Sequence, residues 1–407
     1  MAALSGPALA IFPWGDVIEE FLEPLGLTAD DYAERMRGGW LFGYVAGLQS
    51  AGRRCIVVHA SERVKAPERL THAQTGAPIY LVPGRRSGGG WTDGDPSRRA
   101  VAQWARTPSR AFAGVLRHEG CDAILVQDYE HARFDALTAM AQRLKLPVFA
   151  SFQGGDVTLS PLERRVRRRT LSRCRAIVVA SAKERERLAR TYGYPAERMA
   201  DIPNPVDTEF WRAEDKAAVR QALGVAPDEL LVVNHGRIDI QRKGLDLILE
   251  AWRRLAHPNA RLMLIGSGQD REAFAPMVAA AERVTWLSDY VTDPPLIRRW
   301  LSAADIYITL SRIEGMPVAP LEAMACGLPV VASDAHGIAD ILKGGEAVGG
   351  ILAPGGDPSA AAAALARLAA DPQLRNVLGE RARRHVEATY GVEAVGAALD
   401  QRLAGEF

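Results

Sequence analysis

The sequence has little of several features that mark large classes of protein. Among 407 residues there are four cysteines, far apart and without metal-ligand spacing: Cys55, Cys121, Cys174 and Cys326. We therefore expect buried free thiols rather than disulfides or a zinc site. The formal net charge is only +1, so electrostatics gives no reason to expect a nucleic-acid partner.

Long apolar runs are also missing. No stretch approaches the roughly 18 apolar residues of a membrane-spanning helix. The first residues lack the basic and apolar regions of a secretory signal. We expect a cytoplasmic protein, with peripheral contact at the inner face of a membrane left open.

Short Val/Ile-rich runs alternate with helix-length stretches in both halves of the chain, and the length favours two domains. This alternation is typical of βαβ units, so we predict an α/β fold with two doubly wound parallel sheets. The predicted strands are residues 8–12, 55–59, 79–82, 123–127, 148–152, 176–180, 230–234, 261–265, 283–286, 305–310, 330–333 and 350–352.

A connector at residues 202–207 contains two prolines and no periodicity. We place the domain boundary there, with a first domain at residues 1–207 and a second at residues 208–390. Residues 392–403 form an amphipathic helical pattern.

The most informative feature is a pair of glutamates, Glu314 and Glu322, eight positions apart. A buried-strand pattern precedes them, and Pro320 suits the start of a helix. Glu314 should therefore lie in a strand-to-helix loop and Glu322 in the first helical turn, at the sheet edge where parallel α/β folds bind ligands. The amides of residues 316–319 could receive an anion there, and Gly315 lets backbone approach a ligand.

Two earlier loops carry glycine and basic residues. His235-Gly236-Arg237 ends a predicted strand, and Lys243-Gly244 follows just before a helix. A second glycine-rich turn contains Gly266 and Gly268. Arg237 and Lys243 flank one strand-to-helix loop, so their side chains could converge on a phosphate group. A solvated basic loop is the alternative interpretation.

This ordered set of motifs resembles the Glu-x7-Glu signature and the Gly-Arg…Lys-Gly pair of the retaining, nucleotide-sugar-dependent glycosyltransferases of family 4. The resemblance is dense from about residue 230 to residue 390 and looser before that. It implies the GT-B architecture, in which two Rossmann-like domains face each other across a cleft. It also implies that the C-terminal segment, residues 391–407, crosses back to an acceptor-side first domain.

The resemblance further implies roles for individual residues. Glu314 would contact the donor sugar, Glu322 would accept hydrogen bonds from the ribose, and Arg237 and Lys243 would stabilise the leaving diphosphate. An acceptor hydroxyl would attack on the front face, with no metal or other cofactor. The implied donor-binding residues are Gly39, Gly236, Arg237, Lys243, Gly266, Glu314, Gly315, Met316, Pro317, Val318 and Glu322.

The first domain should supply the acceptor side through Gly38, Gly39 and Gln153. Gln153 stands where many relatives have a histidine, which makes a histidine base in this loop doubtful. Asp156 could orient an acceptor hydroxyl as a catalytic residue, or simply cap the next helix. Family 4 donors are typically UDP-sugars or GDP-mannose, and acceptors are glycans, lipid-linked glycans or metabolites.

Several signals have more than one interpretation. Asp93-Gly94-Asp95 matches a metal-binding pattern of a different transferase fold, but a flexible turn is favoured. The arginine-rich run at residues 164–169 could attract anionic lipid or form a solvated helix face. Residues 12–37 replace the usual short loop and could be a lid, an acceptor-site element or a surface helical insertion. His336 could affect donor choice or occupy a turn.

Other functions stay possible at this stage. An epimerase or a phosphorylase could use the same fold and a nucleotide sugar. A dinucleotide-dependent oxidoreductase is less favoured, because no complete Gly-x-Gly-x-x-Gly follows the first strand. A non-catalytic binding protein is disfavoured by the joint presence of Arg237, Lys243, Glu314 and Glu322.

Overall fold

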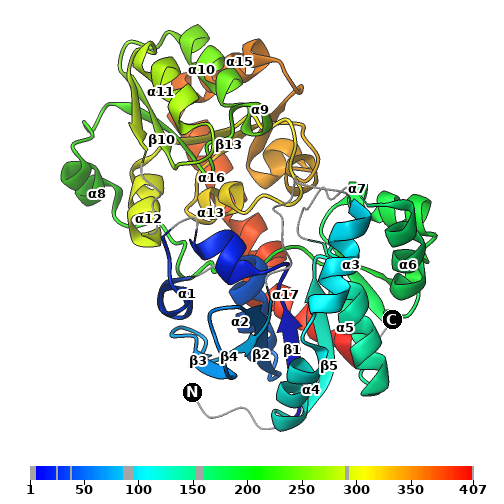
Figure 1. Cartoon of the computed structure of the whole chain (residues 1–407). Coiled ribbons are helices and arrows are strands. Elements are labelled where there is room, and N and C mark those ends of the chain that lie inside the picture. The colour runs from blue at the N-terminus through cyan, green and yellow to red at the C-terminus, as the bar shows by residue number, and fades with distance from the viewer. Residues whose placement is uncertain are drawn as a thin grey trace. The chain divides into compact units, whose positions relative to one another are not determined.

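The computed structural model describes residues 6–23, 26–36, 39–85, 96–152, 159–288 and 293–405. The chain forms two compact units (Figure 1). Unit 1 comprises Met1–Pro205 and Val392–Phe407, and unit 2 comprises Val206–Gly391. The division at Pro205 falls inside the connector in which the sequence places the boundary.

Unit 1 is built around one large sheet with the order β3-β4-β2-β1-β5-β6-β7-β8 within the described residues. All neighbouring strands are parallel except β3 and β4. The strands are β1 (Ala8–Phe12), β2 (Arg54–Ser61), β3 (Glu68–Thr71), β4 (Pro78–Pro83), β5 (Cys121–Gln127), β6 (Val148–Ser151), β7 (Ala176–Val179) and β8 (Met199–Asp201). β3 and β8 are absent from the sequence prediction, and β3 runs antiparallel to β4 at the edge of an otherwise parallel sheet. This edge strand is largely exposed, so it has no apolar run to reveal it.

Both faces of this sheet are covered. Along β1, Ala8, Ala10 and Phe12 belong to one hydrophobic core, whereas Leu9 and Ile11 belong to the other. Successive strand residues point to opposite faces, so a strand covered on both sides must be apolar throughout. This explains why the inner strands of unit 1, such as β1, read as continuous apolar runs.

The helices of unit 1 surround the sheet. They are α1 (Ala29–Arg35), α2 (Tyr44–Ser50), α3 (Pro96–Arg106), α4 (Ser109–His118), α5 (Arg133–Arg143), α6 (Pro161–Leu171), α7 (Ala182–Arg187) and α17 (Val392–Ala404), with short helical turns η1 (Ile18–Leu22), η3 (Gly39–Gly43), η4 (Leu188–Tyr192) and η5 (Ala196–Arg198). α6 begins with a capping box in which Ser160 and Glu163 satisfy each other's backbone N–H groups.

The C-terminal helix α17 packs on α2 in unit 1. A Cβ atom on Gly396 would lie only 2.0 Å from the carbonyl oxygen of Gly47, so the two backbones meet at a contact that only glycine permits. Arg53 also forms an ion pair with Asp400 on α17 at 3.0 Å. The chain's last helix is therefore part of the first unit.

Unit 2 contains a parallel sheet with the order β11-β10-β9-β12-β13-β14 within the described residues. Its strands are β9 (Leu230–His235), β10 (Ala260–Ile265), β11 (Val284–Leu287), β12 (Ile306–Thr309), β13 (Val330–Ser333) and β14 (Gly350–Ala353). Leu231 and Val233 of β9 enter one core and Leu230 and Val232 the other, so this sheet is also covered on both faces.

The helices of unit 2 follow its strands. They are α8 (Lys216–Leu223), α9 (Ile240–Lys243), α10 (Leu245–Leu255), α11 (Arg271–Ala279), α12 (Pro294–Ala303), α13 (Ala319–Ala325), α14 (Ile338–Ile341), α15 (Pro358–Ala370) and α16 (Pro372–Tyr390), with the turn η6 (Gly345–Val348). Pro320 lies in the first turn of α13. A backbone N–H group in the first turn has no intrahelical acceptor. Proline, which lacks this N–H group, is therefore tolerated there.

All four cysteines are free thiols, as predicted. Cys55, Cys174 and Cys326 are buried and Cys121 is half-buried. Burial raises the pKa of each thiol to about 12, so the thiols stay protonated at neutral pH. None of the helices in the described part of the chain combines the length and the apolar character needed to cross a bilayer.

Candidate functional site

The strand order of unit 2 defines where a ligand should bind. β9 and β12 are neighbours in the sheet although β10 and β11 separate them in sequence. Their following loops therefore diverge at a topological switch point, where open parallel sheets have a crevice at the carboxyl ends of their strands. The predicted donor-site residues after β9 and β12 all belong to this edge.

The two glycine-rich turns touch each other at this edge. Gly236 follows β9 with φ +145°, and Gly266 follows β10 with φ +140°. A Cβ atom on Gly266 would lie 1.9 Å from the carbonyl oxygen of Gly236. Both positions thus need glycine for the backbone conformation, and Gly266 needs it also for the close approach.

A short helix brings Lys243 to the end of β12. Asp239 caps α9 by accepting a hydrogen bond from the Arg242 backbone, and Gly244 ends it with φ +60°. A Cβ atom on Gly244 would lie 1.9 Å from the Leu310 carbonyl oxygen. The turn after α9 is therefore pressed against the chain that leaves β12, which places Lys243 beside the Glu314 loop.

Lys243 and Glu314 form an ion pair, with 2.6 Å between Nζ and Oε1. Ser311 donates a hydrogen bond to the same carboxylate oxygen at 2.7 Å, and its own carbonyl accepts one from Ser333. The Glu314 side chain is only 6% exposed, whereas that of Lys243 is 27% exposed. The carboxylate is thus fixed in position, and the ammonium retains access to solvent or ligand.

Glu322 lies in the first turn of α13, and a histidine at the end of β9 contacts its carboxylate. Nε2 of His235 lies 2.8 Å from its Oε2 atom. The Tyr307 hydroxyl donates to the His235 carbonyl at 3.2 Å, and the Tyr307 ring packs against the imidazole edge to face. The sequence analysis gave His235 no role. Its place at the carboxyl end of a strand, just before Gly236, was the available signal.

The other predicted donor residues have fewer contacts. Arg237 is exposed, and its side chain has no hydrogen bond or ion pair with any residue that the structure describes. Met316 and Val318 are half-buried in the loop between the glutamates, and Pro317 is buried. The loop is supported by Gly337, which has φ +71° and whose added Cβ would lie 1.9 Å from the Gly315 carbonyl oxygen.

The predicted acceptor-side residues fall mostly outside the described ranges. Gly38, Gln153, Asp156 and the 93–95 turn lie outside the described residues, and of Gly39 only the backbone, at the start of η3, is described. Across the described ranges, no three His, Cys, Asp or Glu side chains are grouped so as to hold a metal ion.

Unit 1 has its own switch point between β1 and β5. There Arg133, at the start of α5, forms an ion pair with Asp16 at 2.5 Å and donates to the Gly15 carbonyl at 2.8 Å. The ring of Trp14 stacks on His131 with 6.3 Å between centroids. The loops after β1 and β5 thus meet through a buried ion pair and an aromatic contact.

The segment inserted after β1 is part of the unit 1 core. Ile18 of η1 is buried, and Tyr32 of α1 is buried with its hydroxyl 2.9 Å from Nε2 of His59. Glu19 accepts a hydrogen bond from Ser61 at 2.6 Å. The segment is therefore anchored in the unit 1 core through η1 and Tyr32, whereas Asp30, Glu34 and Arg35 of α1 are exposed. Its role as a lid, an acceptor-site element or a surface helical insertion stays a prediction.

Burial shifts the pKa values of several groups near this switch point. Desolvation lowers the pKa of His59 and of His131 to about 3, with the charge of nearby arginines adding to the effect. Desolvation and the neighbouring Glu130 raise the pKa of Asp128 to about 7. Asp128 directly follows β5 and adopts φ +63°, a left-handed conformation that aspartate tolerates better than most residues.

The arginine-rich run of α6 is not one uniform surface. Arg167 is fully buried, forms two 3.1 Å hydrogen bonds to the Asp135 carboxylate and donates to the Tyr129 carbonyl. The remaining arginines of the run are exposed: Arg164, Arg165, Arg168 and Arg169. Arg167 therefore cannot contribute to a lipid-binding face.

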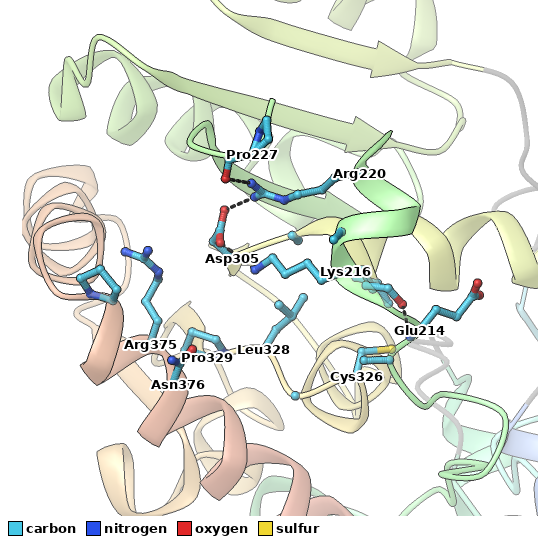
Figure 2. A pocket seen from close by; sticks show the side chains of 17 residues that line it. Glu214, Lys216, Arg220, Pro227, Asp305, Cys326, Leu328, Pro329, Arg375 and Asn376 are labelled. Carbon is cyan, nitrogen blue, oxygen red and sulfur yellow. Dashed lines mark hydrogen bonds and ion pairs between the residues drawn. The ribbon is translucent and has the colours of Figure 1, made fainter. Parts of the chain in front are cut away.

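A cavity of about 560 Å³ lies at the other, amino-terminal edge of the unit 2 sheet, where Asp305 and Pro329 precede β12 and β13 (Figure 2). Lys216 and Arg220 of α8 pair with Asp305 at 2.7 and 2.6 Å. Arg220 also donates to the Pro227 carbonyl at 3.0 Å. Asp305 pairs with both cations, and these contacts hold α8 on the sheet, at the edge opposite the paired glutamates.

Two family profiles match the chain. Residues 44–210 match "Glycosyltransferase Family 4", and residues 229–371 match "Glycosyl transferases group 1". Together these ranges include the switch point of unit 2 and, in unit 1, strand β5 but not β1.

Curated relatives agree with these matches. The D-inositol 3-phosphate glycosyltransferase of Xylanimonas cellulosilytica is 31% identical over 236 residues, which cover 55% of this chain and 56% of that protein. The GDP-mannose-dependent monoacylated alpha-(1-6)-phosphatidylinositol monomannoside mannosyltransferase of Corynebacterium glutamicum is 26% identical over 328 residues, covering 75% and 84%. The chain spans about half the length of the first curated relatives that it matches.

Solved structures share the fold along nearly the whole chain. Sucrose-phosphate synthase from Thermosynechococcus elongatus superposes with a TM-score of 0.73 at 20% identity, covering 98% of both chains. Anabaena HepE in complex with UDP also gives 0.73, at 16% identity, covering 98% of this chain and 99% of that one. With two parallel-sheet units and these matches, the chain belongs to family 4 of the glycosyltransferases and has the GT-B architecture.

Proposed function

We propose that the protein transfers a glycosyl group from a nucleoside diphosphate sugar to a hydroxyl acceptor, with retention of the anomeric configuration. The observation that carries this proposal is the Lys243–Glu314 pair at the switch point of unit 2. The Lys243 ammonium can bind the diphosphate of the donor there. The fixed Glu314 carboxylate beside it can bind the sugar.

The leaving diphosphate needs positive charge as its bond to the sugar breaks. Only one of the three N–H groups of the Lys243 ammonium is needed by Glu314, so the others can donate to phosphate oxygens. Arg237, exposed and without a partner among the described residues, can add a planar fork of donors. Charge stabilisation of this kind is commonly the largest single contribution to catalysis, and no metal ion is needed for it.

The two glutamates would divide the recognition of the donor. Glu314 accepts hydrogen bonds from the sugar and holds it for attack. Glu322 accepts them from the ribose through Oε1, because Oε2 is engaged by His235. Neither carboxylate is needed as a covalent nucleophile.

The reaction we propose exchanges one bond for another on the same face of the sugar. The bond between the anomeric carbon and the phosphate oxygen breaks, and the acceptor oxygen forms the new bond. The acceptor proton passes to the leaving phosphate oxygen. The protein contributes orientation and electrostatic stabilisation. Roles for Gly38, Gly39, Gln153 and Asp156 on the acceptor side stay predictions.

The names of similar proteins suggest which substrates to test first. The Corynebacterium relative is named as GDP-mannose-dependent, and structures of Anabaena HepE contain UDP or UDP-glucose. Other relatives are named as a D-inositol 3-phosphate glycosyltransferase and a lipopolysaccharide core biosynthesis mannosyltransferase. We therefore propose a UDP- or GDP-linked donor and a glycan, lipid-linked glycan or polyol metabolite as acceptor.

A thermal-shift panel of UDP, GDP and ADP would identify the nucleotide, and labelled donors with that base would then identify the product. We expect a glycosylated acceptor whose anomeric proton has the donor's configuration by NMR. Release of a free epimer or of a sugar phosphate would instead indicate an epimerase or a phosphorylase. An inverted product would overturn the retaining mechanism.

A further inference from the structure

We propose that His235 is a positioning residue for Glu322 and thereby sets how well the site discriminates the ribose hydroxyls of its donor. This inference rests on the proposed function and adds a residue to it. His235 acts through Glu322 rather than through direct contact with the substrate.

The side chain and the backbone of His235 are both held in place. Its side chain is 6% exposed, Nε2 lies 2.8 Å from Glu322 Oε2, and its ring packs against the Tyr307 ring at 5.5 Å and 70°. The Tyr307 hydroxyl donates to the His235 carbonyl, so the backbone at the end of β9 is fixed as well. His235 and Glu322 lie 87 residues apart in sequence, and their hydrogen bond joins the end of β9 to the first turn of α13, the helix that follows β12.

The proton of the neutral ring can be assigned from its surroundings. Nδ1 is buried and has no hydrogen-bond partner in the described structure. A proton on Nδ1 would leave a buried N–H group without an acceptor and turn the Nε2 lone pair toward a carboxylate. A proton on Nε2 instead donates to Glu322. We infer that His235 holds Glu322 through an Nε2–H donor.

This hydrogen bond determines which carboxylate oxygen of Glu322 can accept a hydrogen bond from a ligand. Oε2 is occupied, so Oε1 is the oxygen available to a ribose hydroxyl. The Glu322 side chain is 19% exposed, and without His235 it could adopt other rotamers. A preorganised acceptor binds more tightly because less side-chain freedom is lost on binding. Since the ribose is remote from the reacting bond, the loss should appear in donor binding more than in turnover.

The test compares nucleotides with their 2′-deoxy and 3′-deoxy counterparts. Dissociation constants are measured by titration calorimetry for UDP, GDP and ADP and for their deoxy forms. For the nucleotide that binds, we expect the wild-type protein to disfavour one deoxy form by about tenfold, as for a hydrogen bond to a charged acceptor. In His235→Leu, which keeps the apolar bulk, that ratio should fall to within about twofold.

Two amide variants provide a matched control. The amide of His235→Gln can reach the Nε2 position and donate to Glu322, whereas that of His235→Asn lies near Nδ1 and cannot. Gln should preserve most of the ribose discrimination, and Asn should lose it. If His235→Leu fails to fold, the comparison of the Gln and Asn variants still tests the inference. In kinetic assays, KM for the donor should rise more than kcat falls in the Leu and Asn variants.

A double-mutant cycle with Glu322→Ala tests whether His235 acts through Glu322. Combining His235→Leu with Glu322→Ala should weaken nucleotide binding no further than Glu322→Ala alone. Additive losses, or full discrimination in both Leu and Asn variants that remain folded, would overturn this inference and leave the proposed function intact. If wild-type protein binds none of the nucleotides, the proposed function fails and this inference with it.

Discussion

The two sheets place polar side chains at equivalent switch points but expose them differently. In unit 2, the cation of the Lys243–Glu314 pair is 27% exposed. In unit 1, the Arg133 and Asp16 side chains are 8% and 3% exposed, and Arg133 donates a further hydrogen bond to the Gly15 carbonyl. Ion pairs of similar length thus leave one cation available to a ligand and enclose the other in the protein.

This difference teaches how to separate a binding group from a structural one. An enclosed pair has little solvent to replace a lost partner, so removing one member leaves a buried charge. A partly open pair can be hydrated or can bind a ligand when its partner changes. We therefore expect the pair in unit 2 to control chemistry and the pair in unit 1 to control stability.

The largest effect is expected at Glu314. Replacing Glu314 with Ala or Gln should reduce transfer by at least about a hundredfold, because the sugar loses its fixed carboxylate. Single-turnover transfer from a labelled donor measures this, and chemical denaturation checks that the variants fold. Gln substitution of the exposed Glu380 provides a control that should leave turnover normal. Near-normal turnover in purified Glu314→Ala would refute the assignment.

The next largest effect is expected at Asp16. Asp16→Asn should lower the free energy of unfolding by about 3–5 kcal/mol, because Arg133 becomes a buried charge without its counter-ion. The matched control is Asp201→Asn. Its partner Arg185 lies at 2.7 Å, but the Asp201 side chain is 73% exposed, so the loss should stay below about 1 kcal/mol. Equal losses in urea denaturation would contradict the comparison.

A pH-dependent effect is expected at Asp128. Burial raises its pKa to about 7, so native Asp128 keeps a proton that the unfolded chain releases near pH 4. The stability contributed by this proton is fully present below about pH 4 and is lost as pH rises to about 7. Asp128→Asn stays neutral and tolerates the φ of +63°. The free energy of unfolding of Asp128→Asn minus that of the wild type should be roughly 1–3 kcal/mol larger at pH 8 than at pH 4.5.

Urea denaturation of both proteins at the two pH values measures this difference. His59 and His131 titrate in both proteins and therefore cancel in the comparison. An unchanged stability difference between the two pH values would show that Asp128 titrates normally.

The smallest effect is expected on the exposed face of α6. Replacing Arg168 and Arg169 with Gln should change the free energy of unfolding by less than about 0.5 kcal/mol, because both side chains are exposed. Arg167→Gln should cost several times more, because it breaks a buried pair with Asp135. Sedimentation with anionic vesicles tests the membrane interpretation. Loss of vesicle binding in the Arg168/Arg169 variant would favour lipid contact over a solvated helix face.

Much of the fold could be predicted from the sequence. β1 and β13 were predicted with the bounds that the structure shows, because both faces of these strands are buried and the apolar runs are unbroken. β3 could not be predicted in this way, since it pairs with β4 through its backbone while its side chains face solvent. The inserted segment after β1 was hard to interpret for the opposite reason. Its buried polar groups, such as Glu19, look like surface residues until their partners are known.

The candidate site was predictable in part. The residues around Glu314 and Lys243 were identified by their order and spacing, but the Arg237 side chain forms no hydrogen bond or ion pair with any described residue. The sequence assigns no role to His235, because a histidine at the end of a strand indicates no function until the element that faces it is known. The acceptor-side prediction at Gln153 and Asp156 stays untested by the structure.

The sequence by itself determined the alternation of strands and helices and identified the loops that carry Lys243 and Glu314, because local apolar patterns and short motifs carry that information. The tertiary structure decided which charges meet. Lys243 reaches Glu314 across 71 residues, and His235 reaches Glu322 across 87, only because β9 and β12 lie side by side. Strand order depends on the packing of the whole sheet, so no local pattern could have specified these pairs.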